Sequence, residues 1–175
     1  MKPNVSSWQM AGFVFTGLLG TFLHFLFDLT GGSVAAALIS AVNESIFEHI
    51  KLLCYPMMAF ALLEYFLWGK KIPGFWCVQL WGVLLGLCLI PILYYTYTGI
   101  GGISIDWVNI AIFFLSAAAA YRLQAWLFTR SCKLRPWVAV GLLCLLTVIF
   151  TVLTFWPPHI PLFQDPITGA YGFQV

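Results

Sequence analysis

The apolar residues of this chain fall into long, almost unbroken runs. Four runs cover residues 8–29, 75–97, 107–128 and 137–156. Each approaches the length of about 20 residues that a helix needs to cross the hydrocarbon core of a bilayer. The pattern therefore predicts a transmembrane helix over each of the four runs.

The segment between residues 33 and 68 is too long for one crossing, because a helix of that length would extend about 54 Å. We divide it into a short helix over 33–42, which lies in the interface or re-enters the membrane, and a crossing helix over 44–69. Ser45 and Glu48 have capping-box spacing at the start of the crossing helix. The predicted fold is an all-α membrane protein with five transmembrane helices and one short interfacial or re-entrant helix.

The composition indicates that lipid is the solvent of this protein. Hydrophobic residues make up 62% of the chain and charged residues only 8%, whereas a soluble domain carries about 25% charged residues. We therefore expect a single integral membrane domain over 1–175, with the lipid bilayer as its partner and the oligomeric state left open. Nucleic-acid binding is excluded, because the few basic residues form no patch of groove size.

The basic residues predict the orientation, since lysine and arginine accumulate in cytoplasmic loops. With five crossings, the basic residues of three segments fall on one side: Lys2, Lys70, Lys71, Arg130, Lys133 and Arg135. The opposite side holds three acidic residues: Asp28, Asp106 and Asp165. We therefore expect a cytoplasmic N-terminus and an extracytoplasmic C-terminal loop over 157–175.

The cysteines give no sign of a cross-link. They stand in apolar runs or on the predicted cytoplasmic side, and no pair has CxxC spacing: Cys54, Cys77, Cys88, Cys132 and Cys144. Disulfides are rare in the cytoplasm, and cysteine metal sites usually show close spacing. We therefore expect neither a disulfide framework nor a cysteine metal site.

A polar cluster, NESIFEHIK over residues 43–51, interrupts the apolar pattern at the predicted outer end of the second crossing helix. Helical rise places His24, His49 and His159 at the same outer level, although they come from three distant segments. Three imidazoles can hold a zinc ion that keeps a fourth position for water, and the metal lowers the pKa of that water to about 7. The three histidines are candidate ligands, and Zn²⁺ is the candidate cofactor.

The carboxylates near these histidines supply the candidate acid–base groups. Glu48 or Glu44 is the candidate general base, since a metal-bound water needs a proton acceptor nearby. Asp28 stands four residues after His24 on the same helix face and can orient an imidazole. The leading hypothesis is a metal-dependent membrane hydrolase or transferase that acts on a lipid-like substrate at the outer leaflet.

Two alternatives use the same residues without chemistry. Glu44 and Glu48 can bind a small solute or an ion in a transporter or binding subunit. The cluster, including Ser45 and Lys51, can instead form a structural network that holds the C-terminal tail, in which Asp165 lies. Away from the cluster, Glu64 and Arg122 near the inner boundary are expected to pair in the interior or to extend to the interface, in a structural role.

Two segments carry a family resemblance: AVNESIFEHIKLL and the tail segment PPHIPLFQDPITGAYG. Both are similar to motifs of a family of small, uncharacterised bacterial integral membrane proteins known only as a domain of unknown function. The resemblance extends over nearly the whole chain. It implies a multi-pass protein of the bacterial plasma membrane, and it implies no activity, so the site assignment rests on the residues themselves.

Overall fold

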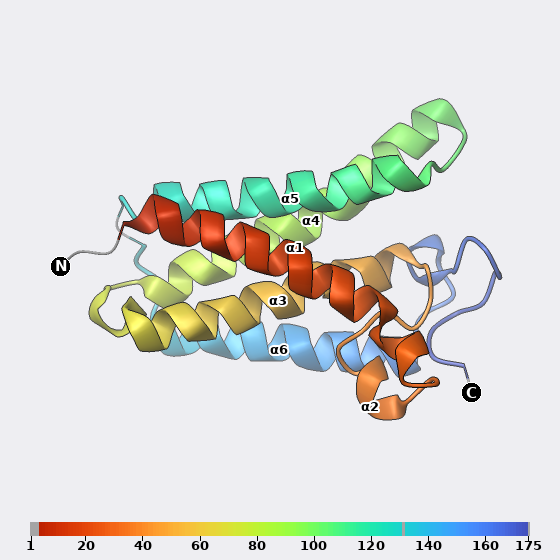
Figure 1. The fold of residues 1–175 in the computed structure, drawn as a ribbon, viewed down its shortest axis with the longest axis horizontal. Coiled ribbons are helices and arrows are strands. Elements are labelled where there is room, and N and C mark those ends of the chain that lie inside the picture. The colour runs from red at the N-terminus through yellow and green to blue at the C-terminus, as the bar shows by residue number, and fades with distance from the viewer. Residues whose placement is uncertain (1–3, 131, 175) are drawn as a thin grey trace.

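The computed structural model describes residues 4–130 and 132–174, and the long apolar runs are helical (Figure 1). The helices are α1 (Val5–Leu29), α2 (Val34–Ala37), α3 (Ile46–Leu67), α4 (Phe75–Gly101), α5 (Asp106–Leu127) and α6 (Pro136–Phe155), with 3₁₀ turns η1 (Gly69–Lys71) and η2 (Pro161–Phe163). In the described part of the chain, the five helices other than α2 are long and apolar enough to cross a membrane. The predicted fold class is confirmed, and the chain is a multi-pass membrane protein.

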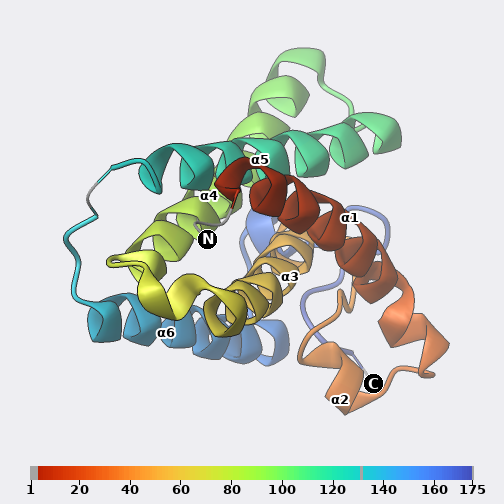
Figure 2. The same ribbon diagram turned by 60° about the vertical axis from the view of Figure 1, so that its left-hand side comes forward.

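Helix α3 lies at the centre of the bundle, where it packs against α1 and α4 and also contacts α5 and α6 (Figures 1 and 2). Its inward side chains form the core together with residues of the surrounding helices: Leu53, Met57, Phe60, Val83, Ile112, Ala117, Ala120, Leu143 and Phe150. Large apolar side chains also cover the outer faces of the peripheral helices: Leu18, Phe22, Ile110, Leu115, Leu145 and Val148. An apolar surface around an apolar core suits a protein surrounded by lipid.

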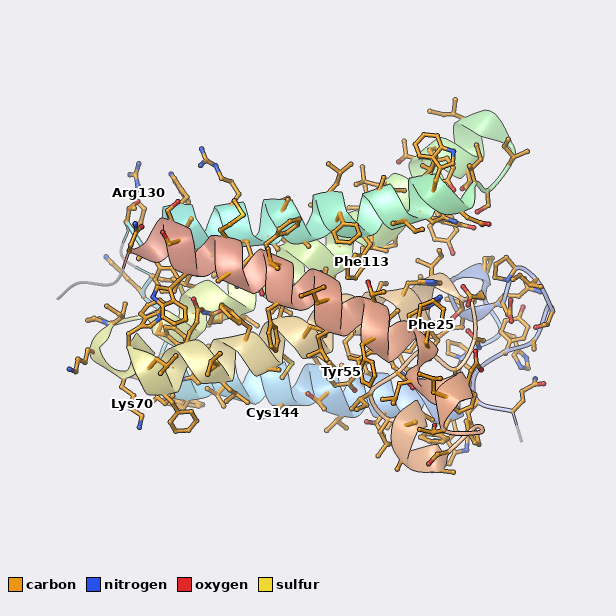
Figure 3. All side chains as sticks on the ribbon, viewed as in Figure 1. Phe25, Tyr55, Lys70, Phe113, Arg130 and Cys144 are labelled. Carbon is orange, nitrogen blue, oxygen red and sulfur yellow. A yellow bond between two sulfur atoms is a disulfide. The ribbon has the colours of Figure 1, made fainter. Side chains whose placement is uncertain are left out.

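The two ends of the bundle carry different side chains. Lys70 and Arg130 lie at the end that holds the α3–α4 and α5–α6 connections, whereas Phe25 lies toward the opposite end, beside α2 and the tail (Figure 3). We call these the inner end and the outer end, following the predicted orientation. That orientation, with the N-terminus in the cytoplasm, stays a prediction.

Helix α2 is shorter than the helix predicted over 33–42. The carbonyl oxygen of Ala36 still accepts the helical hydrogen bond from the Ser40 N–H at 2.9 Å, together with one from the Ser40 hydroxyl at 2.7 Å. The Lys51 ammonium, which reaches across from α3, donates to the carbonyl oxygen of Ala37 at 2.9 Å. The chain therefore turns after one helical turn, and residues 38–45 form a loop that leads into α3.

The predicted capping box at the start of α3 forms only in part. The Ser45 hydroxyl accepts a hydrogen bond from the backbone N–H of Glu48 at 3.4 Å, as a helix N-cap does. The Glu48 carboxylate does not return the bond, because it points into the protein interior. The side-chain oxygen of Asn43 accepts from the Ser45 N–H instead, at 2.9 Å.

A disulfide joins Cys77, at the start of α4, to Cys132 in the α5–α6 connection, so the expectation of no disulfide is wrong. The two Cα atoms are 5.9 Å apart, within the range that a disulfide spans. The sequence does not indicate this pairing, because the two cysteines are 55 positions apart and only the fold brings them together. The disulfide lies at the inner end, which the basic residues predict to be cytoplasmic. Because disulfides are rare in the cytoplasm, the disulfide and the basic residues indicate opposite orientations.

Helices α1 and α3 approach closely where Gly20 faces α3. Pro56 has no N–H group, so the carbonyl oxygen of Leu52, four residues earlier, lacks its usual helical donor. A Cβ atom added to Gly20 would lie 2.8 Å from that oxygen and 2.9 Å from the ring of Phe113. The glycine therefore lets α1 pack directly over the interrupted part of α3, as small residues do in membrane helix pairs.

Replacing Gly20 by alanine should destabilise the protein, because the Leu52 carbonyl is backbone and cannot move aside as a side chain does. We expect a loss of about 1–3 kcal/mol, typical of overpacking. Gly141→Ala in α6 is the matched control, because a Cβ atom there has nothing within 4 Å. It should leave stability unchanged or raise it by up to about 1 kcal/mol. Thermal unfolding in detergent tests the pair, and equal midpoints for the two variants would contradict the close contact.

Candidate functional site

Three polar side chains meet at the outer end, where the C-terminal part of α1, the loop before α3 and the first turn of α3 come together. His24 Nε2 lies 3.7 Å from Oε1 of Glu44, and His49 Nε2 lies 3.4 Å from Oε2 of the same carboxylate. The two imidazole rings are 5.4 Å apart between centroids. We call His24, Glu44 and His49 the histidine cluster. One nitrogen or oxygen atom from each residue lies within 4.8 Å of the others, which suits a shared metal ion.

The first turn of α3 fixes the orientation of His49. Its Nδ1 lies 2.9 Å from the carbonyl oxygen of Ser45. A carbonyl oxygen can only accept a hydrogen bond, so Nδ1 carries the proton and Nε2 faces Glu44. A carboxylate is also only an acceptor, so a positive centre belongs between Nε2 of His49 and Oε2 of Glu44. That centre is either a second proton on the ring or a metal ion.

The remaining surroundings of the histidine cluster are apolar and partly open. His24 packs edge-to-face on the ring of Phe25 at 4.9 Å, and its Nδ1 is buried without a hydrogen-bond partner among the described residues. The side chain of Glu44 is 43% exposed, and those of the two histidines are 28% and 30% exposed. A ligand can therefore reach the cluster from outside the bundle.

The charge of Glu44 responds to its two imidazole neighbours. The long hydrogen bond from His49 lowers the pKa of Glu44, and the positive potential of both imidazoles acts in the same direction. Partial burial opposes this effect but does not cancel it. The carboxylate therefore ionises more readily than an ordinary glutamate, and a metal ligand must be ionised.

The fold brings together only some of the residues that the sequence predicted to form the site. His159 lies in the tail, is exposed, and packs on Tyr171 with 4.6 Å between ring centroids, outside the histidine cluster. Equal depth in the membrane placed it with the other histidines, but depth does not determine the position around the bundle. Asp28 is exposed one turn beyond His24, and no side-chain hydrogen bond joins it to an imidazole in the described part of the structure.

Glu48 and Lys51 form a second group, directly behind the histidine cluster. Lys51 Nζ lies 2.7 Å from Oε2 of Glu48, and both side chains are almost completely buried. The Thr154 hydroxyl of α6 accepts from Lys51 and donates to Oε1 of Glu48, each at 2.9 Å. The Val42 N–H also donates to this carboxylate, at 3.2 Å. Both carboxylate oxygens of Glu48 therefore have partners, and they connect α3 to α6 and to the loop before α3.

Thr154 was missed by the sequence analysis because it stands in an apolar run as one of several threonines. Thr147 and Thr151, one and two turns earlier, bond back to carbonyl groups of their own helix. Thr154 instead faces the buried ion pair. The sequence holds no signal that separates it from its neighbours, because the distinction depends on which face of α6 meets α3.

The C-terminal tail folds back on this end of the bundle. Phe163 is buried and stacks on Phe47 with 4.5 Å between ring centroids. The Phe173 N–H donates to the carbonyl oxygen of Thr154 at 2.8 Å, and the Asn43 side chain donates to the carbonyl oxygen of Gly172 at 3.1 Å. The loop before α3 is therefore held between the bundle and the tail.

Asp165 stabilises the tail locally. Its side chain accepts hydrogen bonds from the Ile167 N–H at 2.8 Å and from the Thr168 hydroxyl at 2.8 Å. This is the turn that an aspartate two residues before the bonded amide typically makes. The Asp165 carboxylate is thus used within its own turn, and the structure gives it no contact with the histidine cluster.

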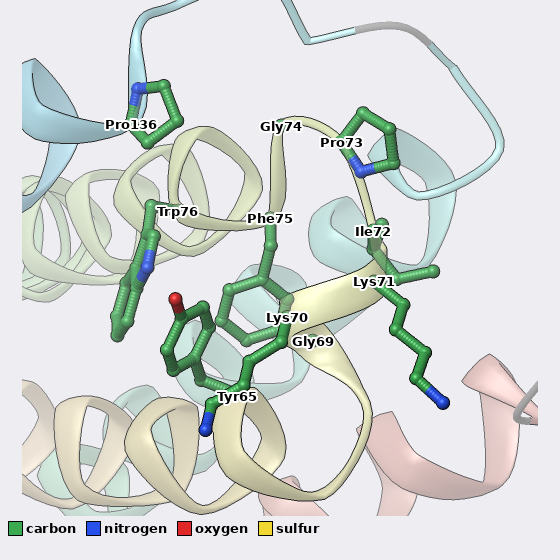
Figure 4. Close-up of a pocket in the computed structure, with 10 residues that line it drawn as sticks. All are labelled: Tyr65, Gly69, Lys70, Lys71, Ile72, Pro73, Gly74, Phe75, Trp76 and Pro136. Atoms are coloured by element: carbon green, nitrogen blue, oxygen red, sulfur yellow. The ribbon is translucent and has the colours of Figure 1, made fainter.

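The inner end holds a cavity of about 300 Å³, lined by the α3–α4 connection and the start of α6 (Figure 4). Tyr65, Phe75 and Trp76 form its aromatic wall, whereas Lys71 points away from it (Figure 4). Lys70 Nζ lies over the ring of Phe66 at 4.6 Å. The cavity lacks convergent polar groups, so we do not assign it a function.

Comparison with protein families matches residues 1–173 to a family of unknown function, DUF6512. Because the match extends over nearly the whole chain, the protein belongs to this family, and the resemblance to an uncharacterised family is confirmed. Comparisons with curated proteins and with solved structures give no match.

Lys51→Met should strongly destabilise the protein, because it leaves the Glu48 carboxylate buried without its cation. Breaking one side of a buried ion pair costs about 3–5 kcal/mol, and the double variant Glu48→Gln/Lys51→Met should recover much of the loss. Lys71→Met, at an exposed position of the inner end, is the control and should change stability by less than about 0.5 kcal/mol. Unfolding in detergent micelles measures all three variants. A Lys51→Met protein as stable as the Lys71→Met control would contradict a stabilising role of this ion pair.

The depressed pKa of Glu44 predicts a pH dependence of stability. The folded-state pKa lies below the ordinary value of 4.5. The ionised carboxylate therefore contributes its full stabilisation above about pH 4.5 and loses it as the pH falls through the folded-state pKa. Metal-free wild type should unfold at a higher temperature than Glu44→Gln at pH 6, and the gap should close at strongly acidic pH. A gap that widens on acidification would show that the contact does not stabilise the ionised form.

Proposed function

We propose that this member of the DUF6512 family binds a zinc ion through His24, Glu44 and His49 and uses it for hydrolysis or group transfer on a lipid-like substrate. The observation that supports the proposal is the spacing of the three side chains. The two nitrogen–oxygen distances, 3.4 and 3.7 Å, are longer than a good hydrogen bond. Two ligands at about 2.0–2.1 Å from one tetrahedral zinc are about 3.3–3.4 Å apart, so the three donor atoms, which lie within 4.8 Å of one another, need to move closer together to share one ion.

The chemistry of the donors also fits zinc. Two imidazole nitrogens and one carboxylate oxygen are a common ligand set of catalytic zinc sites, which leave a fourth position for water. The hydrogen bond between His49 Nδ1 and the Ser45 carbonyl is the kind of outer contact that holds a metal-binding imidazole in place. A bound zinc supplies a Lewis acid and lowers the pKa of its water to about 7. The same ligand types also suit non-haem iron, which metal analysis distinguishes.

A lipid-like substrate is supported by what surrounds the histidine cluster. Phe22 and Phe25 flank His24 on the outer face of α1 and are exposed, as is Leu29 one turn beyond. Val34 and Leu38 of the adjoining α2 region are also exposed. These apolar surfaces lead from the lipid-facing side of the bundle to the half-exposed polar cluster. An amphiphile can place its head group at the cluster while its chains stay in the bilayer.

Proton transfer at the proposed zinc site needs a carboxylate other than Glu44 and Glu48. Glu48 is occupied by Lys51 and Thr154, and Glu44 is assigned here as a metal ligand. Asp28 is exposed and follows His24 by one helical turn on the same face, so we assign it the role of proton acceptor. The transporter alternative gains no support, because it requires the Glu48 carboxylate to be free. We place the protein in the bacterial plasma membrane, with the histidine cluster on the outer side.

Metal analysis of the detergent-purified protein tests the proposal directly. Wild type should hold about one zinc ion per chain, or take one up on titration after chelation. His24→Ala, His49→Ala and Glu44→Gln should lose it, because each removes one of three ligands. His159→Ala is the matched control: it also removes a histidine at the outer end, but one outside the cluster, and should keep the metal. A wild type that neither contains nor binds zinc would overturn the site.

Turnover separates catalysis from binding alone. Zinc-loaded wild type, reconstituted in phospholipid vesicles, should release product from lipid esters, amides or phosphate esters, and His49→Ala should not. Asp28→Asn should keep the zinc and lose about 10²–10⁴-fold in rate, the usual contribution of a positioned proton acceptor. Zinc binding without turnover of any of these lipid classes would leave a metal-binding protein and refute the hydrolase. Iron in place of zinc would refute the choice of metal.

A further inference from the structure

A second polar group lies in the interior near the inner end, away from the histidine cluster. Its centre is Glu64 of α3, whose side chain is fully buried. The carboxylate accepts hydrogen bonds from Gln9 of α1 at 3.1 Å and from Gln79 of α4 at 2.8 Å. Gln124 of α5 donates to the side-chain oxygen of Gln79 at 2.8 Å. Four helices thus contribute one side chain each to what we call the Glu64 cluster.

The Glu64 carboxylate has no counter-ion among the described residues. The ion pairs of the described chain all lie at the outer end. Of the two arrangements predicted for Glu64 and Arg122, the interior ion pair does not form, because Arg122 is exposed on α5. Amide donors stabilise a carboxylate but leave its charge in place. A buried charge inside a membrane normally faces a partner or a bound ligand.

The Glu64 cluster also holds oxygen atoms that lack hydrogen-bond donors. The side-chain oxygens of Gln9 and Gln124 are buried without a partner, although Gln9 is only 4% exposed and Gln124 is completely buried. Buried amide oxygens without a partner are rare in proteins. Rotation about the terminal torsion of Gln9 exchanges its nitrogen for its oxygen and presents that oxygen to Glu64. The Glu64 carboxylate, the Gln9 oxygen and the oxygen of Gln124, which joins the cluster through Gln79, are the oxygen atoms that the cluster offers to a cation.

We propose that Glu64, Gln9 and Gln124 bind one sodium ion inside the helix bundle. One carboxylate balances one positive charge, which favours a monovalent ion over a divalent one. Oxygen-only donors favour a hard cation over zinc or copper. Tight packing favours a small ion, since a Cβ atom added to Gly82 would lie 2.4 Å from the side chain of Gln124. The sodium site is separate from the proposed zinc site and does not depend on it.

A proton is the competing single positive charge at Glu64, so sodium should bind more tightly as the pH rises. The titratable side chain on α5 that packs near the cluster is Tyr121, whose hydroxyl is hydrogen-bonded to Thr16 at 2.7 Å. Tyr65 of α3 faces Trp76 instead. Lys70, Arg122 and Arg130 are exposed at the surface. Glu64 is therefore the group at which sodium and protons compete.

Radioactive sodium binding to the full-length protein in detergent, in choline buffer at pH 8, tests the proposal. Wild type should bind about one sodium ion per chain, and an equal concentration of potassium should not displace it. Sodium should also raise the unfolding temperature in a saturable way, because it binds only the folded state. Glu64→Gln keeps the shape of the side chain and one acceptor oxygen but removes the charge, and it should abolish both effects.

Two further variants keep the test decisive if Glu64→Gln folds poorly. Gln124→Leu keeps the carboxylate but removes one oxygen ligand and should weaken sodium binding by about tenfold, equivalent to about 1.4 kcal/mol. Asp106→Asn removes an exposed carboxylate at the outer end and should bind sodium like wild type. No binding by wild type, equal displacement by potassium, or unchanged binding in Glu64→Gln would overturn the site. A Glu64-dependent effect of pH without any effect of sodium would assign the site to protons and also overturn it.

Discussion

The ion pair between Lys51 and Glu48 is the interaction on which the outer end of this protein depends. Lys51 reaches from α3 to the Ala37 carbonyl, and Glu48 accepts from the Val42 N–H, so the loop between α2 and α3 is held near both of its ends. Glu44 lies in that loop, and His49 follows Glu48 directly in α3. Because a charge pair inside a bilayer-embedded bundle is stable only when every polar atom is satisfied, Thr154 of α6 is part of the same unit.

The polar residues of the bundle divide into one closed group and two open ones. The Lys51–Glu48–Thr154 group is closed, because its charges cancel and its oxygens are occupied. The histidine cluster and the Glu64 cluster lie at opposite ends of α3. Both are open, since each holds a carboxylate and nitrogen or oxygen atoms that have no hydrogen-bond partner. Imidazole nitrogens at one end and amide oxygens at the other favour different ions. Helix α3 thus carries both open groups, which agrees with its central position.

The sequence predicts the five crossing helices because hydrophobic length is a strong local signal. It also predicts that His24 and His49 are neighbours, since helical rise places both at the same depth near the outer end. It fails where position around the bundle matters: His159 shares that depth but packs on Tyr171 in the tail. The contacts of Glu48 could not be predicted either, because its partner Thr154 lies 106 residues away. The Cys77–Cys132 disulfide and the bonding of Ala37 to Lys51 depend on tertiary contacts in the same way.

The contacts between the loop before α3 and the C-terminal part of the chain impose an order on membrane assembly. Asn43 forms a hydrogen bond with Gly172, 129 residues later in the chain. Glu48 gains its hydrogen bond from Thr154 only after α4 and α5 have been made. During synthesis, α1 and α3 therefore enter the bilayer with the Lys51–Glu48 pair lacking its hydroxyl partner and with the loop unsecured. The outer end is therefore complete only after α6 and the C-terminal tail have been made and have docked.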